Sequence, residues 1–263
     1  MQQSWQKRAI FGLEPGYGQH LAETMDANGA DILMSWSLKS DVPVNYYYAF
    51  SHPGLPKERW NEACRGVACM NTLRPPNPRS FSTEALAPTF VSNCGAQPRA
   101  RFLTELGKHL KLHNYGGCWH SPELPPKTGY NDNFKLEVSG KYKFHFAFEN
   151  TLLDDYVSEK FFTPLKMGTT LLVVFGAPNI EDWAPAPHSI INALEYSGPA
   201  ELARYLKYLD KNDTAYLEYF QWMGGEDAFQ QSFKDLEVGN YVNERKDSFV
   251  CRLCTHYRER YCP

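Results

Sequence analysis

A short stretch from Phe146 to Lys160, FAFENTLLDDYVSEK, holds side chains suited to binding a charged ligand. Lys160 offers an ammonium, Tyr156 a hydroxyl, and Glu159 a carboxylate that can accept from ribose hydroxyls. Their spacing of i, i+3 and i+4 would place them on one face of a helix near its first turn. The free backbone N–H groups and the dipole at a helix start favour an anion such as a diphosphate. On spacing alone, a solvated helix start with scattered charges fits these residues at least as well.

The elements around this stretch predict that it lies at the edge of a parallel sheet. Lys141 to Phe148 has the pattern of an aromatic-rich strand, Asp155 to Met167 has helical spacing, and Thr170 to Phe175 is a short apolar run. This order is a βαβ unit, whose ligands usually bind beyond the carboxyl ends of the strands. Pro164 should kink the helix or end it early. A second strand, helix and strand are predicted over residues 87–92, 98–110 and 111–115.

The same stretch resembles the α-1,3-fucosyltransferase family, in which a strand ending in FEN is followed six residues later by Tyr and then by Val, Ser or Thr, Glu and Lys. Every position matches here, and the likeness continues in APTFVSNCGAQPRARF, YGG, GAPNIEDWAPAP and CRLC. The strings SNCGA, YGGC, GAPNI and CRLC are more similar to the plant and invertebrate branch, which fucosylates the innermost GlcNAc of N-glycans, than to the Lewis-type branch. The resemblance implies an α/β, GT-B-like fold: a partial acceptor-side domain with linker at 1–86 and a Rossmann-like, GDP-fucose donor-binding domain at 87–263.

The resemblance also assigns the donor site. The residues that it implies for GDP-fucose are Arg99, Asn150, Tyr156, Glu159 and Lys160. Arg101 is the local alternative to Arg99. We prefer Arg99 because the family pattern has an aromatic residue three positions after the arginine, and Phe102 stands there. Pro98 suits the first turn of a helix, where a guanidinium can give paired hydrogen bonds to phosphate.

The implied activity is an inverting transfer of fucose from GDP-β-L-fucose to O3 of GlcNAc in N-glycans. Such a transfer needs a base that takes the acceptor proton. The resemblance places Glu14, in FGLEPGYGQHL, in that role, and part burial should raise its pKa. A glutamate before a proline is usually a turn residue, and His20, Asp26 and Asp41 are the nearby alternatives.

Neither a metal nor a nucleic acid is expected. The chain has no Asp-x-Asp motif beside a strand, we interpret Asp154 and Asp155 as helix caps, and the histidines lack compelling ligand spacings. A divalent ion would at most stimulate the transfer. The net charge of −3, without a cluster of Lys and Arg interleaved with aromatics, gives no reason to expect a nucleic-acid partner.

The length and the start of the chain bound its organisation. With 263 residues it is long enough for two domains, yet the region before Ala87 shows only two convincing strands, Asp31 to Leu38 and Val44 to Phe50, after one helix, His20 to Asn28. The family resemblance implies a type II membrane protein facing the Golgi lumen, and we expect its anchor and part of its acceptor domain to be absent here. A catalytically inactive nucleotide-sugar or glycan-binding remnant is therefore the alternative function, and a different donor sugar is a third.

The seven cysteines favour disulfides in a lumenal protein, with reduced thiols or zinc half-sites as alternatives. Cys94 and Cys118 follow two strands that should be neighbours, so they can meet, and Cys251 and Cys254 could bridge locally. Cys64 and Cys69 form another close pair. Asn212 opens an Asn-Asp-Thr glycosylation sequon.

Overall fold

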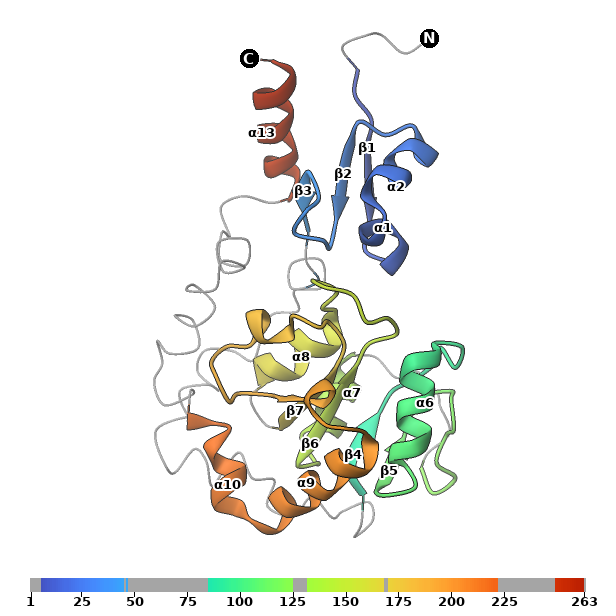
Figure 1. Ribbon diagram of the computed structural model, residues 1–263, viewed down its shortest axis with the longest axis vertical. Helices are drawn as coiled ribbons and strands as arrows, with labels where there is room; N and C mark the ends of the chain where they lie inside the picture. Colours follow the sequence, from blue (N-terminus) through green and yellow to red (C-terminus); the bar gives the residue numbers. More distant parts are fainter. Residues whose placement is uncertain are drawn as a thin grey trace.

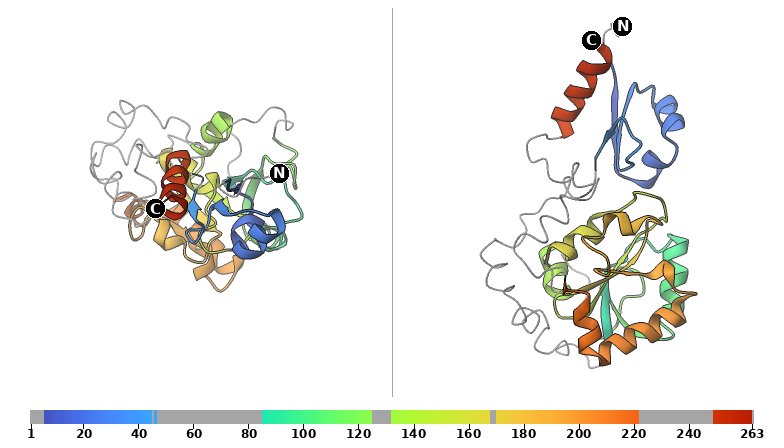
Figure 2. Two further views of the ribbon diagram at one scale, coloured as in Figure 1. Left: turned by 90° about the horizontal axis from the view of Figure 1, so that it is seen from above. Right: turned by 60° about the vertical axis from the view of Figure 1, so that its left-hand side comes forward.

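The computed structural model describes residues 6–44, 46, 85–124, 132–167, 170–221 and 249–262. Figure 1 shows two lobes: a large one formed by residues 85–221, and a small one that combines the N-terminal residues with the C-terminal helix α13. The first and the last described residues therefore lie on the same lobe, which is also visible in Figure 2.

The large lobe is built on parallel strands. Its strands are β4 (Ala85–Thr89), β5 (Lys111–Asn114), β6 (Phe144–Phe148), β7 (Leu171–Phe175) and β8 (Ile191–Asn192). Strand β4 pairs with β5, while β7 pairs with both β6 and β8, all in parallel. Strands β4 and β6 are neighbours. The chain adds β5 on the far side of β4, and it adds β7 and β8 on the far side of β6. The gap between β4 and β6 is thus the topological switch point, where ligands of open parallel sheets usually bind.

Helices cover both faces of this sheet. They are α6 (Gln97–Leu106), α7 (Asp132–Ser139), α8 (Glu159–Met167), α9 (Pro199–Lys211) and α10 (Asp213–Glu218). Alternate residues of a strand face opposite sides, so Leu171 and Val173 join the core beneath α6 and α9, whereas Leu172 packs with α8. Because both faces are covered, all five residues of β6 and all five of β7 are buried.

The small lobe has one three-stranded sheet with helices on it. Its elements are β1 (Ala9–Gly12), α1 (Pro15–Gln19), α2 (Leu21–Asn28), β2 (Ile32–Ser35) and β3 (Val42–Pro43), with parallel order β1-β2-β3. Helix α2 matches the predicted helix closely, but β1 was not expected and β2 is shorter than the strand predicted over Asp31 to Leu38. Val44 lies outside a strand, and most of the strand predicted up to Phe50 lies outside the described residues.

The C-terminal helix α13 (Phe249–Tyr261) packs on β3 of the small lobe rather than on the large one. Leu253 and Tyr257 pack against the buried cluster that includes Val42. Its position is also held by the Tyr261 hydroxyl, which donates to the Asp31 carbonyl at 3.2 Å. The sequence analysis had assigned these residues to the 87–263 domain. In the structure, by contrast, α13 lies beside the small sheet (Figure 1), and its apolar residues pack there.

Candidate functional site

A pocket opens at the switch point between β4 and β6. Its wall combines the end of β4 and the residues after it with β6 and the helices α6, α7 and α8. The lining residues are Thr89, Phe90, Val91, Arg99, Leu103, Lys135, Ser139, His145, Phe146, Phe148, Glu159, Lys160 and Pro164. One pocket is therefore lined by Arg99 from α6 and by Glu159 and Lys160 from α8. The sequence analysis predicted that these residues would meet.

Arg99 reaches across the switch point from the first turn of α6, where Pro98 suits the helix start. Its side chain is buried, and its two terminal nitrogens donate to the carbonyls of Phe148 at 3.1 Å and Asn93 at 3.0 Å. Burial lowers the pKa of Arg99, but the guanidinium remains charged. The Nε atom of Arg99 is buried without a hydrogen-bond partner. A ligand oxygen in the pocket would offer such a partner, so the arginine is preset for an anion.

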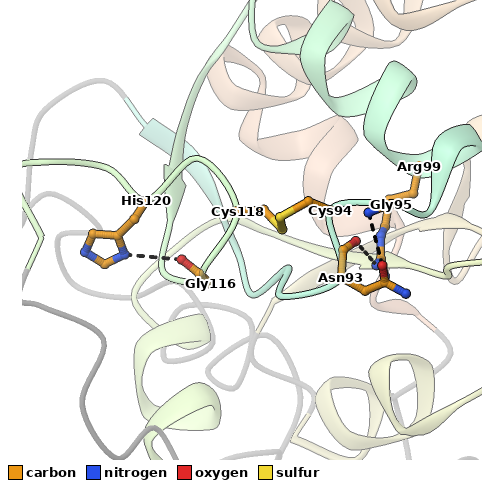
Figure 3. Close-up of a disulfide and its surroundings, with 7 residues drawn as sticks. All are labelled: Asn93, Cys94, Gly95, Arg99, Gly116, Cys118 and His120. Atoms are coloured by element: carbon orange, nitrogen blue, oxygen red, sulfur yellow. Dashed lines mark hydrogen bonds between the residues drawn. A yellow bond between two sulfur atoms is a disulfide. The ribbon is translucent and has the colours of Figure 1, made fainter.

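A disulfide braces the loop that holds Arg99. Cys94 and Cys118 are bonded, with their Cα atoms 5.6 Å apart, which confirms the predicted pair. Figure 3 shows Cys94 beside Asn93, whose carbonyl accepts from Arg99 and whose side chain accepts from the backbone of Gly95 at 3.1 Å. The loops after β4 and β5 are therefore stapled together next to the guanidinium.

Helix α8 begins later than predicted. It starts at Glu159 rather than at Asp155, so Tyr156 lies before the helix and does not share a helical face with Glu159 and Lys160. That part of the sequence argument was wrong. Asp155 has a φ of 66°, which is incompatible with a right-handed helix at this residue. The helix also continues through Pro164 to Met167 instead of ending early.

Tyr156 is buried where the two lobes meet. Its ring packs edge-on against Trp36 at 5.1 Å and Tyr46 at 6.1 Å between centroids, and it does not line the pocket. Burial, together with the charge of Glu149, raises the pKa of its phenol, so the hydroxyl stays protonated. Its assignment to GDP-fucose remains a prediction.

Lys160 stands at the mouth of the pocket among acceptors. Its ammonium lies 2.9 Å from the Ser158 hydroxyl, 3.1 Å from Glu159 Oε1 and 3.4 Å from Glu149 Oε2. Burial lowers the pKa of Lys160, but attraction to Glu149 and Glu159 outweighs it, so the pKa is raised. The side chain is about one-third exposed (34%). Lys160 is therefore a charged, accessible ammonium in the pocket that Arg99 also lines.

Asn150 lies two residues after β6 and is not among the residues that line the pocket. Its Oδ1 atom is buried without a hydrogen-bond partner, which fits a contact to a ligand donor. Asp155, by contrast, is not the helix cap that the sequence analysis proposed. Its carboxylate accepts from the backbone N–H of Leu38 at 3.1 Å and from the Asn179 amide at 3.0 Å. This residue joins the lobes.

Glu14, the candidate base, stands at the N-cap position of α1 on the small lobe, near the same junction, and its side chain makes no cap hydrogen bond. Its carbonyl accepts from Trp36 Nε1 at 3.0 Å, and Trp36 packs on Tyr156. Burial raises the pKa of Tyr46 to about 12, and the charge of Glu14 adds to the rise, so Glu14 is close to this aromatic cluster. Glu14 itself is exposed, not partly buried as expected.

The remaining predicted sites fall elsewhere. Cys254 has a free, exposed thiol, so the local bridge to Cys251 is not formed. Residues three apart in a regular helix such as α13 have Cβ atoms about 5–6 Å apart, more than the roughly 4 Å of a disulfide. Asn212 caps α10, accepting from the Ala215 N–H at 3.2 Å. Cys64 and Cys69 lie outside the described residues.

The sequence analysis gave no role to Glu149 or His145, although both belong to the strand and turn that it singled out. His145 lines the pocket, and its Nδ1 atom lies 2.8 Å from the Ser139 hydroxyl. Glu149 is 2% exposed, and its Oε2 atom lies 3.4 Å from Lys160 Nζ. Its place just after a buried strand, at the carboxyl edge of the sheet, was a signal that could have identified it.

A parallel α/β lobe with two cations at its switch point defines a protein that binds an anionic ligand such as a nucleotide. Residues 82–262 match the family model "Glycosyltransferase family 10 (fucosyltransferase) C-term". The chain belongs to this family of fucosyltransferases, which confirms the family resemblance.

Relatives and solved structures agree with this membership. The chain is 38% identical over 235 residues to "GDP-fucose protein O-fucosyltransferase 3" of Danio rerio, covering 82% of this chain and 50% of that protein. It is 37% identical over 228 residues to "Putative fucosyltransferase-like protein" of Arabidopsis thaliana, covering 86% and 38%. The chain thus spans half or less of the length of these relatives.

The fold is also that of a solved fucosyltransferase. The structure "Crystal Structure of alpha1,3-Fucosyltransferase with GDP-fucose" superposes with a TM-score of 0.57 and 19% identity, covering 94% of this chain and 77% of that one. The likeness confirms the predicted GT-B-like α/β fold. Within the part of the chain that the structure describes, no helix is long and apolar enough to cross a membrane.

Proposed function

We propose that this chain transfers fucose from GDP-β-L-fucose, with inversion, and that the switch-point pocket holds the donor diphosphate. The observation that carries the proposal is that Arg99 and Lys160, from separate helices, line one pocket at the carboxyl edge of a parallel sheet. Two fixed cations stabilise the charge that develops on a leaving diphosphate. No metal has to be invoked for this step, so chelation with EDTA should not abolish transfer.

In this proposal the small lobe supplies the base. Glu14 would take a proton from the acceptor hydroxyl as that oxygen attacks the sugar. Trp36 contacts both the residue proposed as base and the lobe that would bind the donor. It donates to the Glu14 carbonyl and packs on Tyr156, four residues before Lys160. The distance between base and donor therefore depends on how the lobes meet.

For the acceptor, we favour a hydroxyl on a protein side chain. The support is the name of the relatives, protein O-fucosyltransferase 3, which include one 38% identical over most of this chain. O3 of GlcNAc in an N-glycan is the second candidate. It is supported by the SNCGA, YGGC and GAPNI strings. The Cys94–Cys118 disulfide supports a lumenal location, where oxidising conditions preserve such bonds, and we propose the Golgi lumen.

The test is a transfer assay with a panel of acceptors. The chain is incubated with GDP-fucose and with disulfide-bonded protein domains, unglycosylated peptides, or glycopeptides bearing core or antennal GlcNAc, and the products are weighed by mass spectrometry. We expect one added fucose on the protein domains. Addition only to glycopeptides would move the acceptor to GlcNAc. GDP binding without transfer to any acceptor would instead indicate an inactive nucleotide-sugar-binding remnant.

A further inference from the structure

Glu149 is a carboxylate enclosed at the end of β6. Its backbone N–H donates to the Phe175 carbonyl at 2.8 Å, extending the β6–β7 pairing by one residue. Only 2% of the residue is exposed. Gly176 makes room for it, because a Cβ at Gly176 would lie 2.9 Å from Glu149 Cγ. The fold therefore accommodates a buried charge at the edge where the donor is proposed to bind.

The carboxylate is held on one side and incompletely paired on the other. Its Oε1 atom accepts from the Ser158 N–H at 2.9 Å, just before α8 begins. Its Oε2 atom lies 3.4 Å from Lys160 Nζ and is buried without a hydrogen-bond partner. Attraction to Glu149 also opposes the effect of burial on the pKa of Arg99, so the negative charge acts on Arg99 as well as on Lys160.

We propose that Glu149 is a built-in counter-charge that limits the affinity of the pocket for the nucleotide diphosphate. It acts through Lys160 and Arg99: without nucleotide it balances part of their charge, and with nucleotide it repels the diphosphate that they attract. This role rests on the proposed donor site. It would prevent GDP, the leaving product, from being held too tightly.

Removing the charge of Glu149 has two opposite effects on nucleotide binding, and the contacts indicate which one dominates. Loss of orientation would weaken nucleotide binding, but Lys160 keeps the Ser158 hydroxyl at 2.9 Å and the Glu159 carboxylate at 3.1 Å. A glutamine at position 149 also keeps the shape and the acceptor for the Ser158 N–H. Loss of a full negative charge from a buried position, by contrast, raises the positive potential of the whole pocket. The net result should be tighter binding.

The experiment is calorimetric titration of GDP into the wild-type chain and Glu149→Gln. We expect the dissociation constant for GDP to fall about tenfold in the variant, the change that corresponds to one pKa unit of differential interaction. Glu218→Gln is the matched control, because it removes an exposed carboxylate from α10, outside the pocket lining, and should change the constant less than twofold. In the transfer assay, KM for GDP-fucose should fall in parallel.

A merely structural role for Glu149 predicts the opposite sign, so unchanged or weaker GDP binding by folded Glu149→Gln would overturn the proposal. If this variant does not fold, Glu149→Asp replaces it. The shorter carboxylate is drawn away from Lys160, and we expect about two- to threefold tighter binding from weaker repulsion; unchanged or weaker binding would again refute the role. Absence of GDP binding by the wild-type chain would contradict the proposed donor site itself, a different failure.

Discussion

The two lobes handle charge in opposite ways. In the large lobe, Arg99 and Glu149 are buried and Lys160 is two-thirds enclosed, all positioned by strands and helices that are covered on both faces. In the small lobe, the candidate base Glu14 is exposed and stands at the N-cap position of a five-residue helix. In the proposed mechanism, donor recognition is therefore built into the large lobe, whereas the environment of the base depends on what approaches the small lobe from outside.

Polar and apolar contacts join the lobes, and residues of both belong to one buried hydrophobic cluster. The Asp155 carboxylate accepts from the Leu38 N–H at 3.1 Å, and Trp36 packs on Tyr156. Asp155 adopts its φ of 66° while also accepting from Asn179, so the turn before α8 is shaped to make this link. If the large lobe binds the donor and the small lobe supplies the base, changes in the small lobe should affect transfer but not nucleotide binding.

The largest expected effect comes from Glu14→Gln. Loss of a general base should reduce the rate of fucose transfer by about 10³-fold, within the range for acid–base catalysis. GDP binding should stay within twofold, because the donor pocket lies in the other lobe. The measurement is transfer rate and GDP affinity on the same preparation, with Glu23→Gln on the exposed face of α2 as the control. Undiminished transfer would remove Glu14 from the mechanism.

The next effect concerns the brace of the large lobe. Replacing Cys94 and Cys118 together by Ser should lower the free energy of unfolding by about 3 kcal/mol, as estimated from the entropy of closing a loop of this length. It should also weaken GDP binding, because the loop carrying Asn93 holds Arg99. Denaturant unfolding and GDP titration measure both. Cys254→Ser, which changes a free thiol on α13, should alter neither. Unweakened GDP binding by the double variant would show that the loop does not position Arg99.

A smaller effect should follow the protonation of His145. Burial lowers the pKa of His145 to about 3, so at neutral pH the imidazole is uncharged in both the folded and the unfolded chain. As the pH falls below about 6.5, His145 binds a proton in the unfolded chain but not in the folded one. The free energy of unfolding therefore decreases with falling pH until the pH reaches the pKa of the folded state. Between pH 7 and pH 5 this amounts to about 2 kcal/mol. Unfolding curves of His145→Gln should show a loss smaller by that amount, whereas His20→Gln, exposed on the small lobe, should follow the wild type.

The large lobe was more predictable from the sequence than the small one. The order of β6, α8 and β7 and the Cys94–Cys118 pair follow from local periodicity and from the rule that parallel strands share a carboxyl edge. The meeting of Arg99 with Lys160 was implied by the family resemblance instead. The start of α8 does not, because it is set by tertiary contacts. Ser158 donates to Glu149, and Asp155 is drawn to Leu38.

The same reason explains the placement of α13. Its apolar residues could have covered either lobe, and local patterns cannot choose between two distant sheets. The partner is decided by contacts with residues more than 200 positions away, such as Arg260 with Asp41 at 3.2 Å. Tyr156 was misplaced likewise, since its neighbours Trp36 and Tyr46 come from the other lobe.

The central claim is that Arg99 and Lys160 together form one diphosphate site. Calorimetric titration of GDP into the wild-type chain, Arg99→Ala and Lys160→Ala tests it most directly, with exposed Arg101→Ala as the matched control on α6. We predict that Arg99→Ala weakens GDP binding about 100-fold and Lys160→Ala about tenfold, consistent with loss of charge-assisted hydrogen bonds, while Arg101→Ala binds like the wild type. Wild-type affinity in folded Lys160→Ala, or loss of binding in Arg101→Ala instead of Arg99→Ala, would contradict the account.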